Sequence, residues 1–371
     1  MLKDNNLLVN EDVTVIKNLE RKDVELLEEV VIVDRDADLD MFCYGKCEDK
    51  NSELVKRCRG VVFHKDELIM EAFPYTQEYT SFSSDIFDSL DNWLFYESHE
   101  GCLLRFFNFN KKWYLCTHRR LNAFKSRWSG KESFGNIFKR ALYNEEKENI
   151  EFKEGLREGD SEDIICRFQE TLNPENQYMF LVLNTEENRI VCDNPINPKL
   201  YYTGSFCNVS GGRIFKWDEK INIERPKKLD FKSEEEISEY IEKVSYKKSQ
   251  GIICFNNFEF KKPLKVIKIY NDKYMELYNI RNNESSINFR YLQLRNDREK
   301  VLKLRNLYPK SCGNFDNYES ILLKISQYIY NFYVERYINK RYVTIPPQEY
   351  YVMRKCHEWH LLNRKLNRIS F

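Results

Sequence analysis

The sequence lacks any apolar run that approaches the length of a membrane span. Charged residues make up 32% of the chain and the mean hydropathy is −0.66. The first six residues are followed by acidic residues rather than by the apolar core of a secretion signal. These absences argue against a membrane or secreted protein, so we expect a soluble cytoplasmic protein with no membrane partner.

Net charge is also lacking, because 59 Lys and Arg residues balance 59 Asp and Glu residues. The balance hides an asymmetry. Residues 283–371 contain 16 basic and 8 acidic residues, so this part carries +8 and residues 1–282 carry −8. A basic C-terminal part of this kind indicates a polyanionic partner.

Cysteine is present, but in no pattern that indicates a disulfide framework or a zinc site. The 11 cysteines are scattered and odd in number. Cys43 and Cys47 have no second pair, and Cys356, His357 and His360 satisfy no zinc-ligand spacing. We therefore expect buried free thiols in a reducing compartment.

No Pro- or Gly-rich linker interrupts the first 282 residues, where strand-like runs dominate. A helix is expected at 15–28, a hairpin at 106–117, a helix-loop excursion at 144–163, and a capped helix beginning at Ser233. Helices over antiparallel sheets give an α+β class, and we assign residues 1–282 to this domain.

Residues 283–371 change in character. Apolar residues recur at three- and four-residue spacing from Tyr318 to Phe332, which predicts an amphipathic helix of about 20 residues. Pro346 and Pro347 then begin a second helix, since proline is tolerated in a first turn. This part is predicted to be a small, basic, all-α domain.

Five short segments carry the functional signal. They are residues 54–63, 97–104, 178–191, 249–253 and 266–277, in this order across about 220 residues. Residues 58–63 read CRGVVF, 97–101 read ESHEG, 188–191 read NRIV, 250–252 read QGI, and 268–274 read KIYNDKY. No single segment is specific, but the ordered series is.

The series resembles the nucleotidyltransferase motifs of T4-phage-type RNA ligases. The resemblance implies an RNA/DNA-ligase-like, ATP-grasp-like fold of antiparallel sheets with helices. It also implies a reaction in which a lysine attacks the α-phosphate of ATP and forms lysyl-AMP. High Asn, Lys, Ile, Tyr and aromatic content further suggests an AT-rich genome such as that of a large DNA virus, which would place the protein in the host cytoplasm.

The chain departs from these motifs at four positions. Ser98 stands at the nucleophilic lysine, and a serine hydroxyl is a poor nucleophile without an adjacent base. Leu181 and Gln250 stand at acidic positions that organise the ribose or a metal, so no metal site is expected. Tyr270 replaces a lysine that would neutralise phosphate charge. The hypothesis is a pseudoenzyme that no longer forms lysyl-AMP.

Four motif residues remain as candidates for nucleotide or phosphate binding. Arg59 can reach phosphate through its planar guanidinium, and Lys268 keeps the first lysine of its motif. Glu100 keeps a carboxylate beside Gly101, either for the base or as a cap on the turn. A salt bridge for Arg59 and a solvated lysine at 268 are the structural alternatives.

An active ligase would need a lysine elsewhere, together with ATP and Mg²⁺. Lys248 has the outline of a nucleophile motif, but too little sequence follows it, and Lys56 fits better as a solvated residue. No other cofactor is expected.

RNA is the expected partner. The basic side chains of the C-terminal part are the candidates for RNA contact, against the alternative of a solvated face: Arg336, Lys340, Arg341, Arg354, Lys355, Arg364, Lys365 and Arg368. The hypothesis is non-covalent binding of RNA or nucleotide. The alternatives are an active ATP-dependent RNA ligase with a displaced lysine, and a structural subunit that binds a protein partner in an RNA-processing assembly.

Overall fold

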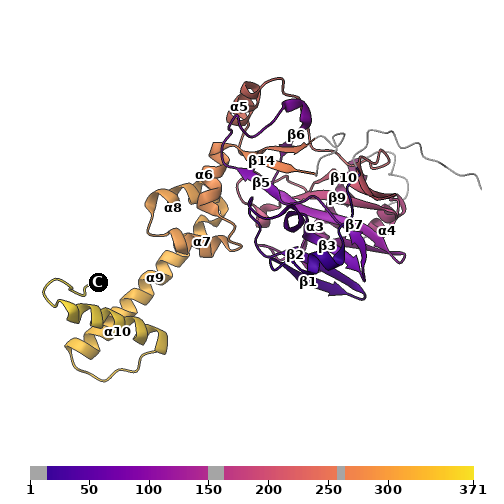
Figure 1. Ribbon diagram of the computed structural model, residues 1–371. Helices are drawn as coiled ribbons and strands as arrows, with labels where there is room; N and C mark the ends of the chain where they lie inside the picture. The colour runs from indigo at the N-terminus through magenta and orange to yellow at the C-terminus, as the bar shows by residue number, and fades with distance from the viewer. Residues whose placement is uncertain (1–14, 149–162, 257–263) are drawn as a thin grey trace, which may run out of the picture. The chain divides into compact units, whose positions relative to one another are not determined.

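The computed structural model describes residues 15–148, 163–256 and 264–371, and the chain divides into two compact units, Met1–Ser285 and Ser286–Phe371. Figure 1 shows strands and helices mixed in the first unit and helices alone in the second. The predicted α+β class, with antiparallel sheets and a helical C-terminal region, is confirmed.

Three sheets build the first unit. The N-terminal sheet has the order β1-β2-β3-β4, the central sheet β11-β10-β9-β7-β8, and the third sheet β12-β6-β13-β14-β5. Neighbouring strands are antiparallel except for β14 and β5, which are parallel. The strands are β1 Val30–Asp36, β2 Leu39–Tyr44, β3 Arg59–His64, β4 Glu67–Met70, β5 Thr76–Tyr79, β6 Trp93–Ser98, β7 Gly101–Phe109, β8 Lys112–Cys116, β9 Asn176–Leu183, β10 Leu200–Val209, β11 Gly212–Lys216, β12 Lys228–Leu229, β13 Gly251–Asn256 and β14 Val266–Tyr270.

Helices cover the outer faces of two of these sheets. On the central sheet, Phe106 and Phe180 pack with Phe138 of one helix and Ile164 of another. On the third sheet, Ile252 packs with a helix that follows β12. The helices of this unit are α1 Arg21–Glu25, α2 Glu53–Arg57, α3 Phe134–Glu148, α4 Asp163–Glu170, α5 Glu234–Lys243 and α6 Asp272–Arg281.

Local sequence signals place several of these elements. The hairpin predicted at 106–117 is formed by β7 and β8, and Asn110 and Lys111 both have positive φ, as a tight hairpin turn requires. Ser233 accepts a hydrogen bond from the backbone N–H of Glu236 and begins α5 as predicted. The excursion predicted at 144–163 lies largely outside the described residues.

The helix predicted at 15–28 is wrong, because only α1 is helical there. Ile16 instead forms an isolated antiparallel bridge with Arg213, which lies on β11. The side chain of Asn18 accepts a hydrogen bond from the Arg213 Nε at 3.1 Å. A pairing across almost 200 residues therefore overrides the local helical pattern.

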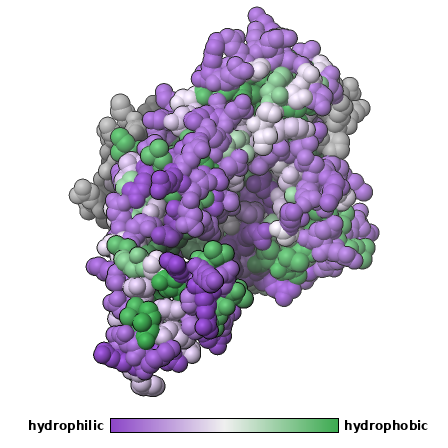
Figure 2. Space-filling view, turned by 90° about the vertical axis from the view of Figure 1, so that its left-hand side faces the viewer, coloured by the Kyte–Doolittle hydropathy of each residue, from purple (hydrophilic) through white to green (hydrophobic). Residues whose placement is uncertain are grey.

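The second unit consists of helices α7 Ile287–Leu294, α8 Arg298–Leu307, α9 Cys312–Tyr333 and α10 Pro347–Leu362. The two predicted helices correspond to α9 and α10. A single π-helical turn, Val334–Ile338, extends α9. None of the helices in the described ranges is long and apolar enough to cross a membrane. The face drawn in Figure 2 is mostly hydrophilic, with hydrophobic residues in separate patches.

A buried ion pair connects the residue that follows β4, in the N-terminal sheet, to β11 of the central sheet. The Arg213 and Glu71 side chains are 1% and 5% exposed and form a salt bridge, and Arg57 also binds Glu71 at 2.9 Å. Removing one partner of a buried pair leaves an uncompensated charge, which costs about 3–5 kcal/mol.

We therefore expect Arg213→Met to lower the free energy of unfolding by about 3 kcal/mol, near the lower limit for a broken buried pair because Arg57 remains. Arg35→Met is the matched control, since Arg35 pairs with Asp40 at 3.0 Å but is 68% exposed. It should cost less than about 1 kcal/mol. Urea unfolding measures both, and equal losses would contradict a central role for the buried pair.

Candidate functional site

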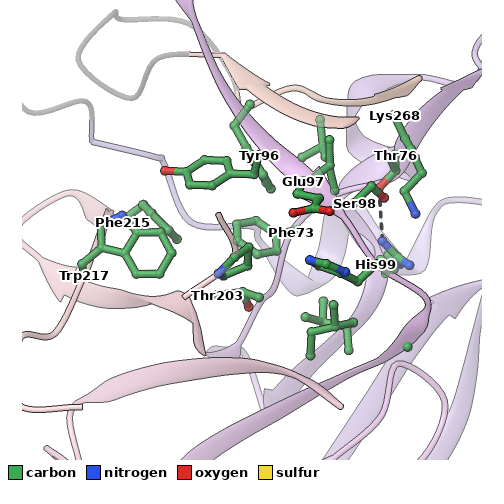
Figure 3. Close-up of a pocket in the computed structure, with 18 residues that line it drawn as sticks. Phe73, Thr76, Tyr96, Glu97, Ser98, His99, Thr203, Phe215, Trp217 and Lys268 are labelled. Carbon is green, nitrogen blue, oxygen red and sulfur yellow. Dashed lines mark hydrogen bonds between the residues drawn. The ribbon is translucent and has the colours of Figure 1, made fainter. Parts of the chain in front are cut away.

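A cavity of about 170 Å³ opens between the central and third sheets of the first unit. Strands β6, β13 and β14 contribute one wall, and β7, β9, β10 and β11 contribute the other. Figure 3 shows these side chains converging on one space. The lining residues are Arg59, Phe73, Thr76, Tyr96, Glu97, Ser98, His99, Gly101, Leu103, Leu181, Thr203, Phe215, Trp217, Pro226, Ile253, Phe255, Val266 and Lys268.

The cavity has an aromatic end and a cationic end. Phe215 and Trp217 lie at one side in Figure 3, with their ring centroids 5.7 Å apart and nearly perpendicular. Ser98, Thr76 and Lys268 lie at the other side. Such a division suits a ligand that has a flat apolar part and an anionic part.

Ser98 ends β6 and is 2% exposed overall. Its hydroxyl donates to Oε1 of Gln250 at 3.1 Å, and the Lys268 ammonium donates to the same oxygen at 3.0 Å. The Gln250 amide nitrogen in turn donates to the Tyr274 hydroxyl at 2.7 Å. One amide therefore joins three polar side chains, and we call Ser98, Gln250, Lys268 and Tyr274 the glutamine network.

Ser98 donates its hydroxyl proton to no carboxylate or imidazole in this network. The neighbouring His99 stacks on Tyr201, with ring centroids 4.8 Å apart and planes at 22°. Burial lowers the pKa of His99. Ser98 is thus held as a hydrogen-bond donor to an amide, which cannot accept its proton.

Lys268 is placed on the cavity face of the third sheet, where it pairs with Ile253 on β13 and Glu78 on β5. Burial lowers its pKa, the Glu78 carboxylate opposes this effect, and the Arg59 guanidinium adds to it. A buried amine with a lowered pKa is easier to deprotonate than a surface lysine.

Tyr270 stands where the resemblance implies a second lysine, and it adds no positive charge to the site. Its hydroxyl donates to Oε1 of Glu78 at 2.8 Å, and its ring stacks on Tyr274. Burial and the Glu78 carboxylate raise the pKa of Tyr270, so its hydroxyl stays neutral. Lys268 and Arg59 are the basic side chains that line the cavity.

Glu100 does not line the cavity. Its buried carboxylate accepts the backbone N–H groups of Ile190 and Val191 at 3.3 and 2.7 Å. Burial raises the pKa of Glu100. Glu100 therefore binds backbone N–H groups near residue 190 rather than capping the turn at Gly101. Gly101 and Leu181 do line the cavity.

Arg59 begins β3, and its Nη1 lies 3.5 Å from both the Pro74 carbonyl and the Thr76 hydroxyl. Sequence reasoning missed the residue that holds its backbone. Arg105 is 1% exposed and donates to the Arg59 carbonyl at 3.0 Å and the Gly60 carbonyl at 2.5 Å. Gly60 has φ +75°, and a Cβ there would lie 2.6 Å from Arg105, so glycine is required.

The lysines considered as displaced nucleophiles lie elsewhere. Lys56 forms an ion pair with Glu53 at 2.9 Å, and Lys248 is exposed. Neither lines the cavity.

A divalent cation would find few protein ligands at this site. Across residues 15–148, 163–256 and 264–371, no three His, Cys, Asp or Glu side chains are grouped to hold a metal ion. The Gln250 amide oxygen already accepts from Ser98 and Lys268. The residues present therefore do not fit a metal held by the protein alone, and a cation could enter only with the phosphates of a nucleotide.

The second unit contains the basic side chains predicted to contact RNA, and only some of them form ion pairs with glutamates. Arg341 pairs with Glu335 at 3.2 Å, and Arg354 and Lys355 both pair with Glu358, at 3.2 and 3.1 Å. Within the described part of the chain, Arg336 and Lys340 form no ion pair. The charges of Arg341, Arg354 and Lys355 are therefore neutralised locally, whereas those of Arg336 and Lys340 are not.

No protein-family model matches the chain. The chain is similar to an immediate-early protein ICP-46 homolog of Invertebrate iridescent virus 6, with 26% identity over 344 residues, 86% of this chain and 71% of the relative. It is also similar to the homolog from Invertebrate iridescent virus 3, with 30% identity over 244 residues, 64% of this chain but only 48% of the relative. Both relatives are viral, in agreement with the expected type of source.

Solved structures provide a second comparison. A putative ATP-dependent DNA ligase from Aquifex aeolicus matches with 14% identity and a TM-score of 0.44, over 80% of this chain and 74% of that chain. An archaeal ATP-dependent RNA ligase matches with 10% identity and a TM-score of 0.40, over 75% and 72%. The matched proteins are ATP-dependent ligases, one of DNA and one of RNA, and the T4-phage type is not shown.

The lowered pKa of Lys268 has a consequence for stability. Because folding favours the neutral amine, unfolding takes up protons between the lowered pKa and about 10.4, so this residue makes stability rise with pH through that window. We expect the ¹⁵Nζ signal of Lys268, assigned with Lys268→Arg, to titrate below about 10.4, the value of an unperturbed lysine. Lys268→Met should remove the corresponding rise in unfolding free energy. Titration of Lys268 at about 10.4 would contradict a lowered pKa.

Proposed function

We propose that this protein binds a nucleotide non-covalently in the cavity of the first unit and contacts RNA through the basic second unit. The observation that carries the proposal is the glutamine network. Arg59, Ser98 and Lys268 line one cavity, where the two basic side chains are available to phosphate and the serine donates to an amide.

The two ends of the cavity match the two parts of a nucleotide. A base can pack against the aromatic side chains at this end, where Tyr96 and Trp217 contact each other with ring centroids 6.3 Å apart. Phosphate oxygens fit the Arg59 guanidinium and the Lys268 ammonium, which supply charge-assisted hydrogen bonds. ATP is the nucleotide implied by the resemblance, and Mg²⁺ would accompany its phosphates.

Covalent chemistry through Ser98 is disfavoured by its surroundings. Its proton is directed to Gln250, and neither Gln250 nor the stacked His99 is placed to accept it. The cytoplasm, of the host if the source is viral, is the proposed location. A third possibility, a structural subunit with a protein partner, would apply if neither nucleotide nor RNA binds.

Lys268 favours a second candidate function, an ATP-dependent ligase with a displaced lysine. Its amine is buried at the cavity, has a lowered pKa, and shares the acceptor of the residue at the nucleophile position. In this reaction the deprotonated Nζ would attack the α-phosphorus of ATP. A P–N bond would form as the bond to the pyrophosphate oxygen breaks and pyrophosphate leaves. We rank it second because Lys268 is needed as a phosphate contact.

The first test combines binding with covalent capture. We expect ATP or GTP to bind in equilibrium dialysis, and Arg59→Gln to weaken binding about 10-fold or more through a lost charge-assisted hydrogen bond. Arg120→Gln is the control, since Arg120 is 57% exposed and pairs with Asp34 at 3.6 Å. Labelled nucleotide at the α-phosphate should not remain after denaturing electrophoresis.

Ser98→Lys alone should not restore labelling, because Leu181, Gln250 and Tyr270 are unchanged. A label that survives denaturation in the natural chain would contradict the non-covalent proposal. If Lys268→Arg then abolishes it while Ser98→Ala and Lys248→Arg do not, the displaced-lysine ligase is the function.

The RNA part of the proposal predicts salt dependence. Each neutralised phosphate contributes a slope of about −0.7 to a plot of log affinity against log salt for single strands. We expect RNA affinity to fall steeply between 50 and 200 mM salt, and Arg336→Glu to reduce affinity and flatten the slope. Arg341→Glu should have the smaller effect because Arg341 is already paired. Undetectable binding at both salt concentrations would end the RNA proposal and leave nucleotide binding unaffected.

A further inference from the structure

Aromatic rings and cations alternate on one surface of the second unit. The Arg336 guanidinium lies 5.2 Å from the ring centroid of Tyr350 on α10 and 6.0 Å from that of Tyr337. The His357 ring stacks on Tyr337, with centroids 3.7 Å apart and planes at 17°. Tyr350 and His357 are seven residues apart, so they lie on the same side of α10 two turns from each other.

Two more cations belong to this surface. Burial lowers the pKa of His357, and the nearby charges of His360, Lys340 and Arg364 add to this effect. We define the stacking surface as Arg336, Tyr337, Lys340, Tyr350, His357 and Arg364. In the part of the chain that the structure describes, its three permanent cations form no ion pair, whereas Arg341, Arg354 and Lys355 are paired with glutamates.

The backbone at this surface is unusual. Arg336 and Tyr337 lie in the π-helical turn, where the backbone N–H of Asn339 donates to the Val334 carbonyl at 2.8 Å. Lys340 follows with φ +57°, a left-handed conformation that a non-glycine residue adopts at a cost. Single π-turns within helices often occur at functional sites. Here the turn brings Arg336 and Tyr337 into contact with α10.

The charge and rings of this surface match one class of partner. Single-stranded nucleic acid offers unstacked base faces beside phosphates, and each base stacked on an aromatic ring contributes about 1–3 kcal/mol. A duplex keeps its bases stacked internally and offers such a surface only its phosphates. Tyr342 is 90% exposed and follows Lys340 by two residues, and we include its ring in the stacking surface.

We propose that the stacking surface binds a single-stranded segment of RNA, with bases on its rings and phosphates on Arg336, Lys340 and Arg364. This inference rests on the RNA part of the proposed function and goes beyond it by naming the strand state and the contacts. The proposal also predicts different effects for the two kinds of residue. The cations should contribute to binding of any RNA, whereas the rings should contribute to binding of single strands alone.

The test uses the full chain and fluorescein-labelled RNA of one sequence, as a single strand and as a duplex, in anisotropy titrations at constant salt. The double variant Tyr342→Leu/Tyr350→Leu keeps apolar bulk but loses two rings. We expect it to weaken single-strand binding about 10-fold or more and to leave duplex binding within twofold. Arg336→Gln/Lys340→Gln should weaken both. Matched controls are Tyr328→Leu, an exposed ring of α9, and Lys324→Gln, a lysine of α9.

Each of the other outcomes contradicts a defined part of the two proposals. RNA binding that the ring variant leaves unchanged contradicts the stacking surface but not the proposed function. Absence of RNA binding by the natural chain, with nucleotide binding intact, contradicts the RNA part of both proposals. Single-stranded DNA of the same sequence bound equally tightly would contradict the assignment to RNA. Unchanged ATP binding and unfolding midpoint in each variant confirm that the fold is intact.

Discussion

The Gln250 amide oxygen is the point on which the cavity depends, because it accepts both the Ser98 hydroxyl and the Lys268 ammonium. The two donors come from strands that lie on either side of β13, where Gly251 pairs with Ser98 on β6 and with Tyr270 on β14. Gly251 has φ +134°, and a Cβ there would lie 2.2 Å from the Ile269 carbonyl. A neutral amide satisfies two donors at once but does not compensate the charge of Lys268. The buried ammonium consequently has a lowered pKa and an unmet preference for an anion, which a phosphate would satisfy.

The junction between the two sheets gives residues 99 to 101 structural roles that do not depend on the residue at position 98. Only His99 and Glu100 separate β6 from β7, so the chain changes sheets within two residues. Glu100 binds backbone N–H groups near residue 190, and His99 stacks on β10. Both therefore hold the wall of the cavity in place. Gly101 is similarly constrained, because a Cβ there would lie 2.4 Å from the Val182 carbonyl. Three of the four residues from 98 to 101 thus have structural reasons to be retained that do not depend on catalysis.

Short sequence patterns correctly predicted the elements that depend on neighbouring residues. The Asn110-Lys111 hairpin, the Ser233 cap and the helix α9 follow from turn chemistry, capping and periodicity. The motif order also correctly predicted that Arg59, Ser98 and Lys268 share one cavity. What the sequence could not indicate was long-range. Arg105 reads as one charge in an apolar strand, yet its guanidinium holds the backbone of residues 59 and 60. The helix expected at 15–28 failed because Ile16 pairs with β11 instead. Glu78 belongs to no recognised motif, and only the sheet register places it beside Lys268.

The basic side chains of the second unit differ in whether a nearby glutamate neutralises them, which the composition does not reveal. The excess of eight positive charges led to eight basic side chains as candidates for RNA contact. Glu335 and Glu358 neutralise three of them, Arg341, Arg354 and Lys355. Exposed pairs of this kind contribute little to stability, but each must be broken or rearranged before its cation can bind phosphate fully. The unpaired cations lie beside stacked rings, and there the field is not cancelled locally. Electrostatic attraction and base stacking are therefore available at the same place, which net charge alone could not have indicated.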